Sequence, residues 1–196
     1  MRKADIKRKT RETDITLDLD LDGKGESKID TGCGFLNHML ELFAKHGRFD
    51  MDLKCVGDMD VDAHHTVEDV AIVLGQGFDK ALGTRQGITR YGDIILPMDE
   101  ALVLAAVDIS ARAHLSCGLS IPSQKVGDFD TELAKEFFEG FSRASGICIH
   151  LKQFSGENSH HIIEAAFKAF ARALKKAVSM ESGFENDIPS TKGMIV

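Results

Sequence analysis

The strongest constraint on the fold of this chain is a repeat, because one short histidine-rich pattern occurs at two distant places. The stretch AHHTVED spans Ala63 to Asp69, and the stretch SHHIIEA spans Ser159 to Ala165. Each copy places two adjacent histidines shortly before a glutamate: His64, His65 and Glu68 in the first, and His160, His161 and Glu164 in the second. Two matching patterns in one chain indicate that a structural unit has been duplicated.

The hydrophobic pattern before and around the first copy predicts alternating strands and helices. Residues Ile15 to Asp22 alternate strictly between apolar and polar side chains, which is typical of a half-buried antiparallel strand. Apolar residues then recur at helical spacing from Phe35 to Gly47, and alternation returns from Phe49 to Cys55. A second helix is predicted from Ala63 to Leu82, with Asp62 as its N-cap.

The same order of elements follows after a glycine-rich junction, Gly83 to Gly92. A strand is predicted for Ala101 to Ile109, a helix for Thr131 to Ala144 and a strand for Ile147 to Leu151. A long amphipathic helix begins at Ser159. We therefore expect an α+β fold, a tandem duplication of a strand-strand-helix-strand-helix unit whose sheets carry their helices on one face. The two expected halves are residues 1–86 and 87–196.

Composition excludes several classes of function. The 196-residue chain has a net charge of -7, so its totals indicate no basic face for nucleic acid. No apolar run is long enough for a membrane span, and no apolar segment of a signal peptide follows the basic N-terminus. The four cysteines are scattered without a CxxC pair, which indicates reduced thiols in a cytoplasmic protein.

Helix geometry predicts how the doubled pattern could bind metal. Residues i and i+4 share one helical face, whereas residue i+1 points about 100° away. His64 and Glu68 can therefore hold one ion, while His65 must serve another. The simplest closed scheme has two ions. One takes His65 with His160 and Glu164, and the other takes His161 with His64 and Glu68.

These ligand types suit Zn, Mn or Fe, but they do not identify a reaction. A metal-dependent hydrolase and a metal-buffering or structural assembly both remain open at this point. The other histidines carry weaker signals. His38 lies in a mostly apolar helix, as core histidines do, and we expect His46, His114 and His150 to be structural or surface residues.

Beyond these patterns, the sequence resembles the imidazoleglycerol-phosphate dehydratase family over nearly its whole length. The segments that carry the resemblance are RETDI (11–15), GFLNHML (34–40), DAHHTVEDV (62–70), GITRYG (87–92), SHHIIEAAFKAFARAL (159–174) and PSTKG (189–193). Because the sequence carries no phosphatase-like extension, it resembles the monofunctional form of the family. The resemblance implies a lyase of histidine biosynthesis that dehydrates imidazoleglycerol phosphate to imidazoleacetol phosphate.

The resemblance also implies two Mn ions per active site, which agrees with the scheme from helix geometry. It adds His38 to the first ion, which gives His38, His65, His160 and Glu164. It further implies that the substrate imidazole is held as an imidazolate, that the chain forms an assembly of 24 subunits, and that active sites lie between subunits.

The remaining site residues match the family's motifs. Glu12 matches its candidate for proton transfer. Arg90 and Arg112 match its substrate arginines, whose guanidinium groups suit phosphate oxygens. The rest of the expected substrate pocket comprises Lys168, Ser190, Thr191 and Lys192. PSTKG lacks the full glycine-rich P-loop pattern, so it does not indicate a nucleotide.

The fourth ligand of the second ion is where this sequence departs from the family. The family usually takes a histidine from a motif HFF, but the corresponding residue here is Glu136, in AKEFFEGF. Aligning the strand at Phe49 with that at Ile147 gives an offset of 98 residues, which also carries His38 onto Glu136. A glutamate would favour a harder ion such as Mn. His150, in the following strand, is the alternative ligand.

Overall fold

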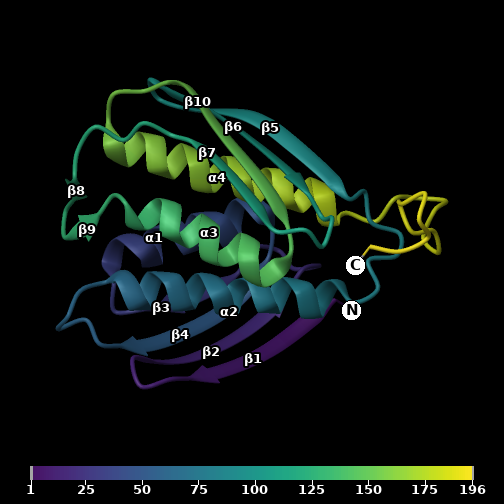
Figure 1. Cartoon of the computed structure of the whole chain (residues 1–196), viewed down its shortest axis with the longest axis horizontal. Helices are drawn as coiled ribbons and strands as arrows, with labels where there is room; N and C mark the ends of the chain where they lie inside the picture. The colour runs from purple at the N-terminus through teal and green to yellow at the C-terminus, as the bar shows by residue number, and fades with distance from the viewer. Residues whose placement is uncertain (1, 196) are drawn as a thin grey trace.

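Two sheets enclose a layer of helices (Figure 1) in the computed structural model, which describes residues 2–195. Within those residues there are two four-stranded sheets, a two-stranded hairpin and four helices. The first sheet has the order β1 (Lys3–Lys9), β2 (Thr13–Asp20), β4 (Asp50–Gly57), β3 (Ser27–Asp30). The second has the order β5 (Tyr91–Met98), β6 (Ala101–Asp108), β10 (Cys148–Ser155), β7 (His114–Gly118). The hairpin consists of β8 (Lys125–Val126) and β9 (Phe129–Asp130).

The two sheets have the same topology, which confirms the predicted duplication. In the first sheet the edge strand β3 runs parallel to β4, and in the second the edge strand β7 runs parallel to β10. All other neighbouring strands in the two sheets are antiparallel. The central register also repeats, because Leu17 pairs with Leu53 as Ala105 pairs with Leu151. The division at residues 86 and 87 falls in the loop between the sheets and stays a prediction.

The predicted unit was one strand short in each half. Three strands, rather than two, precede the first helix of each half, and the β8–β9 hairpin is a further addition to the second half. The four strands of the two large sheets for which no range was predicted, β1, β3, β5 and β7, all lie at sheet edges. At most one residue of each is buried. Edge strands with little buried surface do not show the alternation by which strands are recognised.

The helices lie where the hydrophobic periodicity predicts them: α1 (Gly34–Gly47), α2 (His64–Leu82), α3 (Leu133–Ser145) and α4 (Ser159–Val178). The predicted N-cap of α2 was wrong by one position. Ala63 occupies that place without a side-chain hydrogen bond, although the Asp62 carboxylate accepts one from the backbone N–H of His64 at 2.7 Å. In α4 the side chain of Asn158 caps the helix by accepting from His160 and His161.

The core lies between the sheets and joins the two halves. Helix α1 packs against α4 and helix α2 against α3, so each pair combines one helix from either half. Buried phenylalanines fill these contacts, with Phe43 stacked on Phe170 and Phe78 edge-on to Phe141. Helices α1 and α4 run parallel, because Phe35 and Phe43 of α1 meet His160 and Phe170 of α4 in the same order. Helices α2 and α3 also run parallel, because Gly140 lies against Glu68 and Ser145 lies against Gly75. Burial of so much apolar surface makes the helix layer the main source of stability.

The cysteines agree with the expectation of reduced thiols. All four are free, with Cys33 and Cys55 buried and Cys117 and Cys148 half-buried. Burial raises the pKa of the Cys55 thiol to about 11, so this residue is an inert part of the core. Among the helices of residues 2–195, none combines the length and the apolar character that a membrane crossing requires.

Candidate functional site

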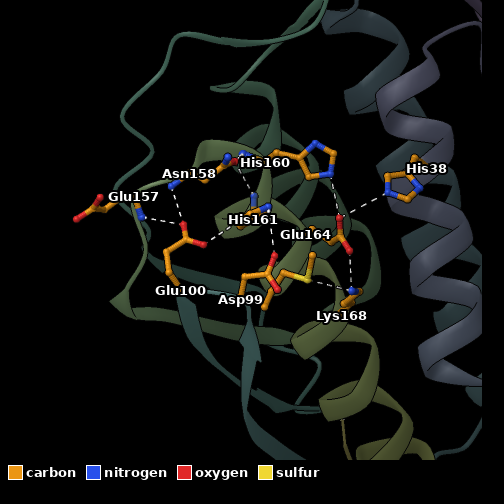
Figure 2. A network of polar contacts seen from close by, with 10 residues as sticks. His38, Asp99, Glu100, Glu157, Asn158, His160, His161, Glu164 and Lys168 are labelled. Carbon is orange, nitrogen blue, oxygen red and sulfur yellow. Dashed lines mark hydrogen bonds and ion pairs between the residues drawn. The ribbon is translucent and has the colours of Figure 1, made fainter.

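One group of metal-ligand side chains converges where α1 meets α4. His38 lies on α1, while His160 and Glu164 lie one turn apart on the first turns of α4 (Figure 2). Glu164 Oε2 is 2.9 Å from His160 Nε2 and 3.6 Å from His38 Nε2. One ligand atom from each of the three residues lies within 4.8 Å of the others, a spacing that a single ion can bridge. Within residues 2–195 this is the one such group of three or more.

Glu164 is held in its charged form at the centre of this group. Burial alone raises the pKa of its carboxyl group, but Lys168 and His160 outweigh that effect and keep the pKa below its usual range. Lys168 Nζ lies 2.6 Å from Glu164 Oε1 and 3.3 Å from the sulfur of Met98. Lys168 was predicted to line the substrate pocket, and the structure places it beside the predicted metal ligands.

His161 points away from this group and toward the β5–β6 turn. Its Nδ1 lies 2.7 Å from Glu100 Oε2, and its Nε2 lies 3.6 Å from Asp99 Oδ2 (Figure 2). The hydrogen bond with Glu100 raises the pKa of His161, and the same bond lowers the pKa of Glu100 to about 2. Neither Asp99 nor Glu100 was predicted as a site residue. Their place in the turn of the first hairpin of the second half corresponds to that of Glu12 in the first half.

The first copy of the pattern, with His64, His65 and Glu68, lies at the start of α2, where α3 packs beside it. Glu68 forms a 2.5 Å ion pair with Arg143 of α3. At Gly140 of α3 the two helices nearly touch, because an added Cβ there would lie 3.2 Å from the Glu68 carbonyl oxygen. Glu136 precedes Gly140 by one helical turn and is half-buried. Since α2 and α3 run parallel, Glu136 lies beside the first turn of α2, which begins at His64.

His65 turns to a different set of side chains. Its Nδ1 lies 2.9 Å from Asp58 Oδ2, and its Nε2 lies 3.8 Å from Glu12 Oε1. The hydrogen bond with Asp58 raises the pKa of His65. His65 therefore does not join His38, His160 and Glu164 within one chain, and His161 does not join His64 and Glu68. A single chain brings together three of the four ligands expected for the first ion.

His150, the alternative ligand for the second ion, lies on the other side of its sheet. Ile149 and Leu151 are buried against the helices, whereas His150 is exposed and its Nε2 lies 3.4 Å from the sulfur of Cys148. Strand alternation therefore places it on the face opposite to α2 and α3. Within one chain His150 cannot reach His64 or Glu68.

A separate pocket collects five of the six residues predicted to bind substrate. It has a volume of about 610 Å³, and its lining includes Arg90, Arg112, Ser190, Thr191 and Lys192. Arg90 is already engaged, since its Nε donates to Asp108 at 2.8 Å and its Nη1 donates to the Pro189 carbonyl at 2.7 Å. Arg112 is more available, because 65% of its side chain is exposed.

This pocket and the histidine group lie at opposite ends of α4. The backbone N–H of Arg90 donates to the carbonyl of Ala177, near the end of that helix, whereas Glu164 is in its second turn. At 1.5 Å per residue the two positions are about 20 Å apart along the helix. A hollow of about 710 Å³ on the outer face of the first sheet is larger than the pocket, but its lining contains none of the predicted site residues.

Comparisons with known proteins identify the family. The family model "Imidazoleglycerol-phosphate dehydratase" matches residues 31–174, which is more than half of the chain. The chain belongs to this family. A relative from Xanthobacter autotrophicus is 52% identical over 195 residues, covering 100% of this chain and 99% of the relative. A relative from Acetivibrio thermocellus is 53% identical and covers 99% of both chains. Both bear the name of the family.

Solved structures of family members have the same fold. The structure from Staphylococcus aureus is 39% identical with a TM-score of 0.83, covering 90% of this chain and 98% of its own. That from Pyrococcus furiosus is 38% identical with the same TM-score of 0.83, covering 96% and 99%. Family membership makes the chain a hydro-lyase of histidine biosynthesis. It decides against the hydrolase and the metal-buffering assembly as interpretations of the doubled pattern.

Proposed function

We propose that the chain dehydrates imidazoleglycerol phosphate to imidazoleacetol phosphate at a site that holds two Mn ions between copies of the chain. The observation that carries the proposal is the meeting of His38, His160 and Glu164 across the two halves. Two imidazoles and a carboxylate form a donor set suited to Mn, with Zn or Fe as the next candidates. The phosphorylated substrate, an assembly of 24 subunits and a cytoplasmic location complete the proposal.

The first ion would be held by His38, His160 and Glu164 of one copy and by His65 of another. In its own chain, His65 lies with Asp58 and Glu12, and 35% of its side chain is exposed at the start of α2. The second ion would correspondingly take His64 and Glu68 of one copy and His161 of another. Each doubled pattern then serves two ions without requiring adjacent histidines to share one.

Glu136 would complete the second ion, and the pseudo-symmetry of the helix pairs supports this choice. Helix α1 lies beside the start of α4 and presents His38 to His160 and Glu164. Helix α3 lies beside the start of α2 in the same parallel manner, with Gly140 against the Glu68 carbonyl oxygen. Glu136 occupies the position of His38 in that second pair. Its carboxylate replaces a neutral imidazole, which favours a hard ion.

The chemistry of the step requires removal of a proton from a carbon next to the substrate imidazole. Two bound ions would supply the Lewis acidity that lets the ring be held as an imidazolate. Glu12 would move the proton, because its exposed carboxylate lies 3.8 Å from His65 Nε2. Glu12 and His65 would therefore enter the same composite site together.

The phosphate group would bind in the pocket at the far end of α4. Arg112 and Lys192 supply positive charge there, and Ser190 and Thr191 supply hydroxyl groups. Arg90 shapes the pocket by holding Asp108 and the Pro189 carbonyl. Lys168 lies with the histidine group, so it would contact the part of the substrate nearer the ions. A pocket about 20 Å along α4 from Glu164 is too distant to serve the same substrate within one chain.

The test is to strip the protein with a chelator, restore Mn and incubate it with imidazoleglycerol phosphate while following formation of the ketone product. Turnover should be restored by Mn, and elemental analysis should approach two ions per chain. Absence of product from the reloaded protein would overturn the reaction. Full turnover by the stripped protein, or saturation near one ion per chain, would overturn the two-ion site.

A further inference from the structure

His65 and His161, the two histidines that turn away from the group of His38, His160 and Glu164, each have Nδ1 against a carboxylate. Neither carboxylate has an assigned role in the site described above. His65 Nδ1 lies 2.9 Å from Asp58 Oδ2, and His161 Nδ1 lies 2.7 Å from Glu100 Oε2. Neither carboxylate belongs to the helix that carries its histidine. Asp58 follows β4, and Glu100 lies in the turn between β5 and β6 (Figure 2). Both histidines therefore have a carboxylate at Nδ1, but a different element supplies that carboxylate in each half.

The hydrogen bonds determine which ring nitrogen is left to bind a ligand. A neutral imidazole carries one N–H and one lone pair, and an ionised carboxylate can only accept. The proton of His65 and of His161 must then reside on Nδ1, which leaves the lone pair on Nε2. Histidines that bind metal commonly have the other ring nitrogen held in this way.

Comparison of the halves indicates how the two glutamates diverged. Leu17 pairs with Leu53 as Ala105 pairs with Leu151, and Glu12 and Glu100 each lie five residues before the paired strand residue. They are therefore counterparts. In the first half Asp58 holds His65, so Glu12 stays exposed. In the second half a β-bulge between Gln153 and Ser155 shifts the alignment by one residue, so Gly156 corresponds to Gly57 and the exposed Glu157 to Asp58. There Glu100, rather than the counterpart of Asp58, holds the histidine.

Glu100 also holds the segment that precedes α4. Its Oε1 accepts backbone N–H groups from Glu157 at 3.1 Å and from Asn158 at 2.8 Å. The Asn158 side chain in turn caps α4 by accepting from the N–H groups of His160 and His161. One carboxylate oxygen thus anchors the helix start, and the other orients His161.

The geometry points to Glu100 and Asp58 as positioning residues that make Nε2 the metal-binding nitrogen of His161 and His65. This inference rests on the proposed function, because it assigns the binding atom of two histidines in the two-ion site. The inference gives the two corresponding glutamates, Glu12 and Glu100, different roles. Glu12 is kept for proton transfer, while Glu100 sets the tautomer of a ligand.

The decisive variant is Glu100→Gln. The amide oxygen must face the two backbone N–H donors, because turning the NH₂ group toward them would oppose donor to donor. The NH₂ group then donates to His161 Nδ1, which moves the ring proton to Nε2. Glu100→Gln should retain the anchor of α4 and the melting temperature, yet weaken binding of one of the two Mn ions by roughly 10- to 100-fold in titration calorimetry.

Two comparisons separate this effect from a structural one. Glu100→Ala loses the anchor but forces no tautomer, so it should melt at a lower temperature yet bind the affected ion no more weakly than Glu100→Gln. The matched control is Glu157→Gln, an exposed glutamate on the same segment, which should leave both ions unchanged. Asp58→Asn can turn its amide oxygen to His65 Nδ1, so its effect should be smaller than that of Glu100→Gln.

The outcomes distinguish failure of the inference from failure of the proposed function. If the unaltered protein binds two Mn ions and Glu100→Gln binds both with unchanged affinity, the assignment of Nε2 is wrong while the two-ion site stands. The assignment is equally wrong if Glu100→Gln binds normally and only Glu100→Ala is impaired. If the unaltered protein binds no Mn, both the two-ion site and the inference are wrong.

Discussion

At the scale of single residues, Glu12 combines exposure with closeness to a proposed metal ligand. Its carboxylate lies 3.8 Å from His65 Nε2, yet Asp58 rather than Glu12 fixes the orientation of that ring. Removing its charge should therefore affect proton transfer more than metal binding.

We predict that Glu12→Gln lowers kcat by at least about 100-fold, the usual contribution of a general acid or base, with metal content unchanged. The measurements are steady-state kinetics and elemental analysis of the same preparation. Glu26→Gln, at an exposed glutamate outside the candidate site, is the control. Normal turnover in Glu12→Gln would remove this residue from the mechanism.

The two pocket arginines should behave differently, because their surroundings differ. Arg112 has a largely exposed guanidinium group, so Arg112→Ala should raise KM by roughly 10- to 100-fold through loss of a charge-assisted hydrogen bond to phosphate. Arg90 is paired with Asp108 and bonded to Pro189, so Arg90→Ala should raise KM and also lower the melting temperature. Kinetics combined with thermal unfolding measure both effects. An unchanged KM in Arg112→Ala would place the phosphate elsewhere.

At the scale of secondary-structure elements, the parallel packing of α3 on α2 places Glu136 beside the first copy of the pattern, while the alternation of β10 turns His150 outward. We predict that Glu136→Ala loosens one of two Mn ions and spares the other, whereas His150→Ala spares both. Calorimetric titration with Mn measures the two affinities. Retention of full affinity at both sites in Glu136→Ala, or loss of an ion in His150→Ala, would reverse the assignment.

The contact of β5 with α4 depends on a glycine. A Cβ added at Gly92 would lie 1.9 Å from the carbonyl oxygen of Ala173, a backbone atom that cannot move without shifting the helix. We predict that Gly92→Ala destabilises the protein by about 2 kcal/mol, as overpacking of a tight contact does. The midpoint of urea unfolding measures this change. Gly34→Ala should be harmless, because a Cβ there meets no described atom within 4 Å.

At the scale of the whole molecule, one chain holds the parts of the proposed site at separate places. His65 is turned from His38, His160 and Glu164, and the phosphate pocket is at the other end of α4. The proposal of shared sites follows from this separation, since an enzyme needs its ions and its phosphate contacts around one substrate.

Complementation between inactive variants tests the sharing. His65→Ala and Glu164→Gln should each be inactive alone, because each removes a ligand of the first ion. In co-expressed mixed assemblies, a site that takes His65 from one variant and Glu164 from the other is intact, so about a quarter of the sites should recover in a random mixture. Activity of the mixture no higher than that of either variant alone would locate the whole site within one chain.

The sequence by itself determined the elements that carry a strong periodicity, and with them the chemistry of the ligands. Alternation from Ile15 and helical spacing at Phe35 and Ser159 are local properties, so they predicted β2, α1 and α4 close to their observed bounds. The doubled pattern indicated the duplication that the two matching sheets confirm. No range was predicted for the edge strands β1, β3, β5 and β7, because few of their residues are buried.

Only the tertiary structure decided which side chains meet. Helical periodicity could place His160 and Glu164 on one face, but their approach to His38 depends on the packing of α1 against α4 across the two halves. The partnership of His161 with Glu100 likewise depends on where the β5–β6 turn lies relative to the start of α4. These contacts join residues far apart in the sequence, and periodicity within one element carries no information about its neighbours in space. The types of ligand are therefore local information, whereas their partners are set by the packing of the core.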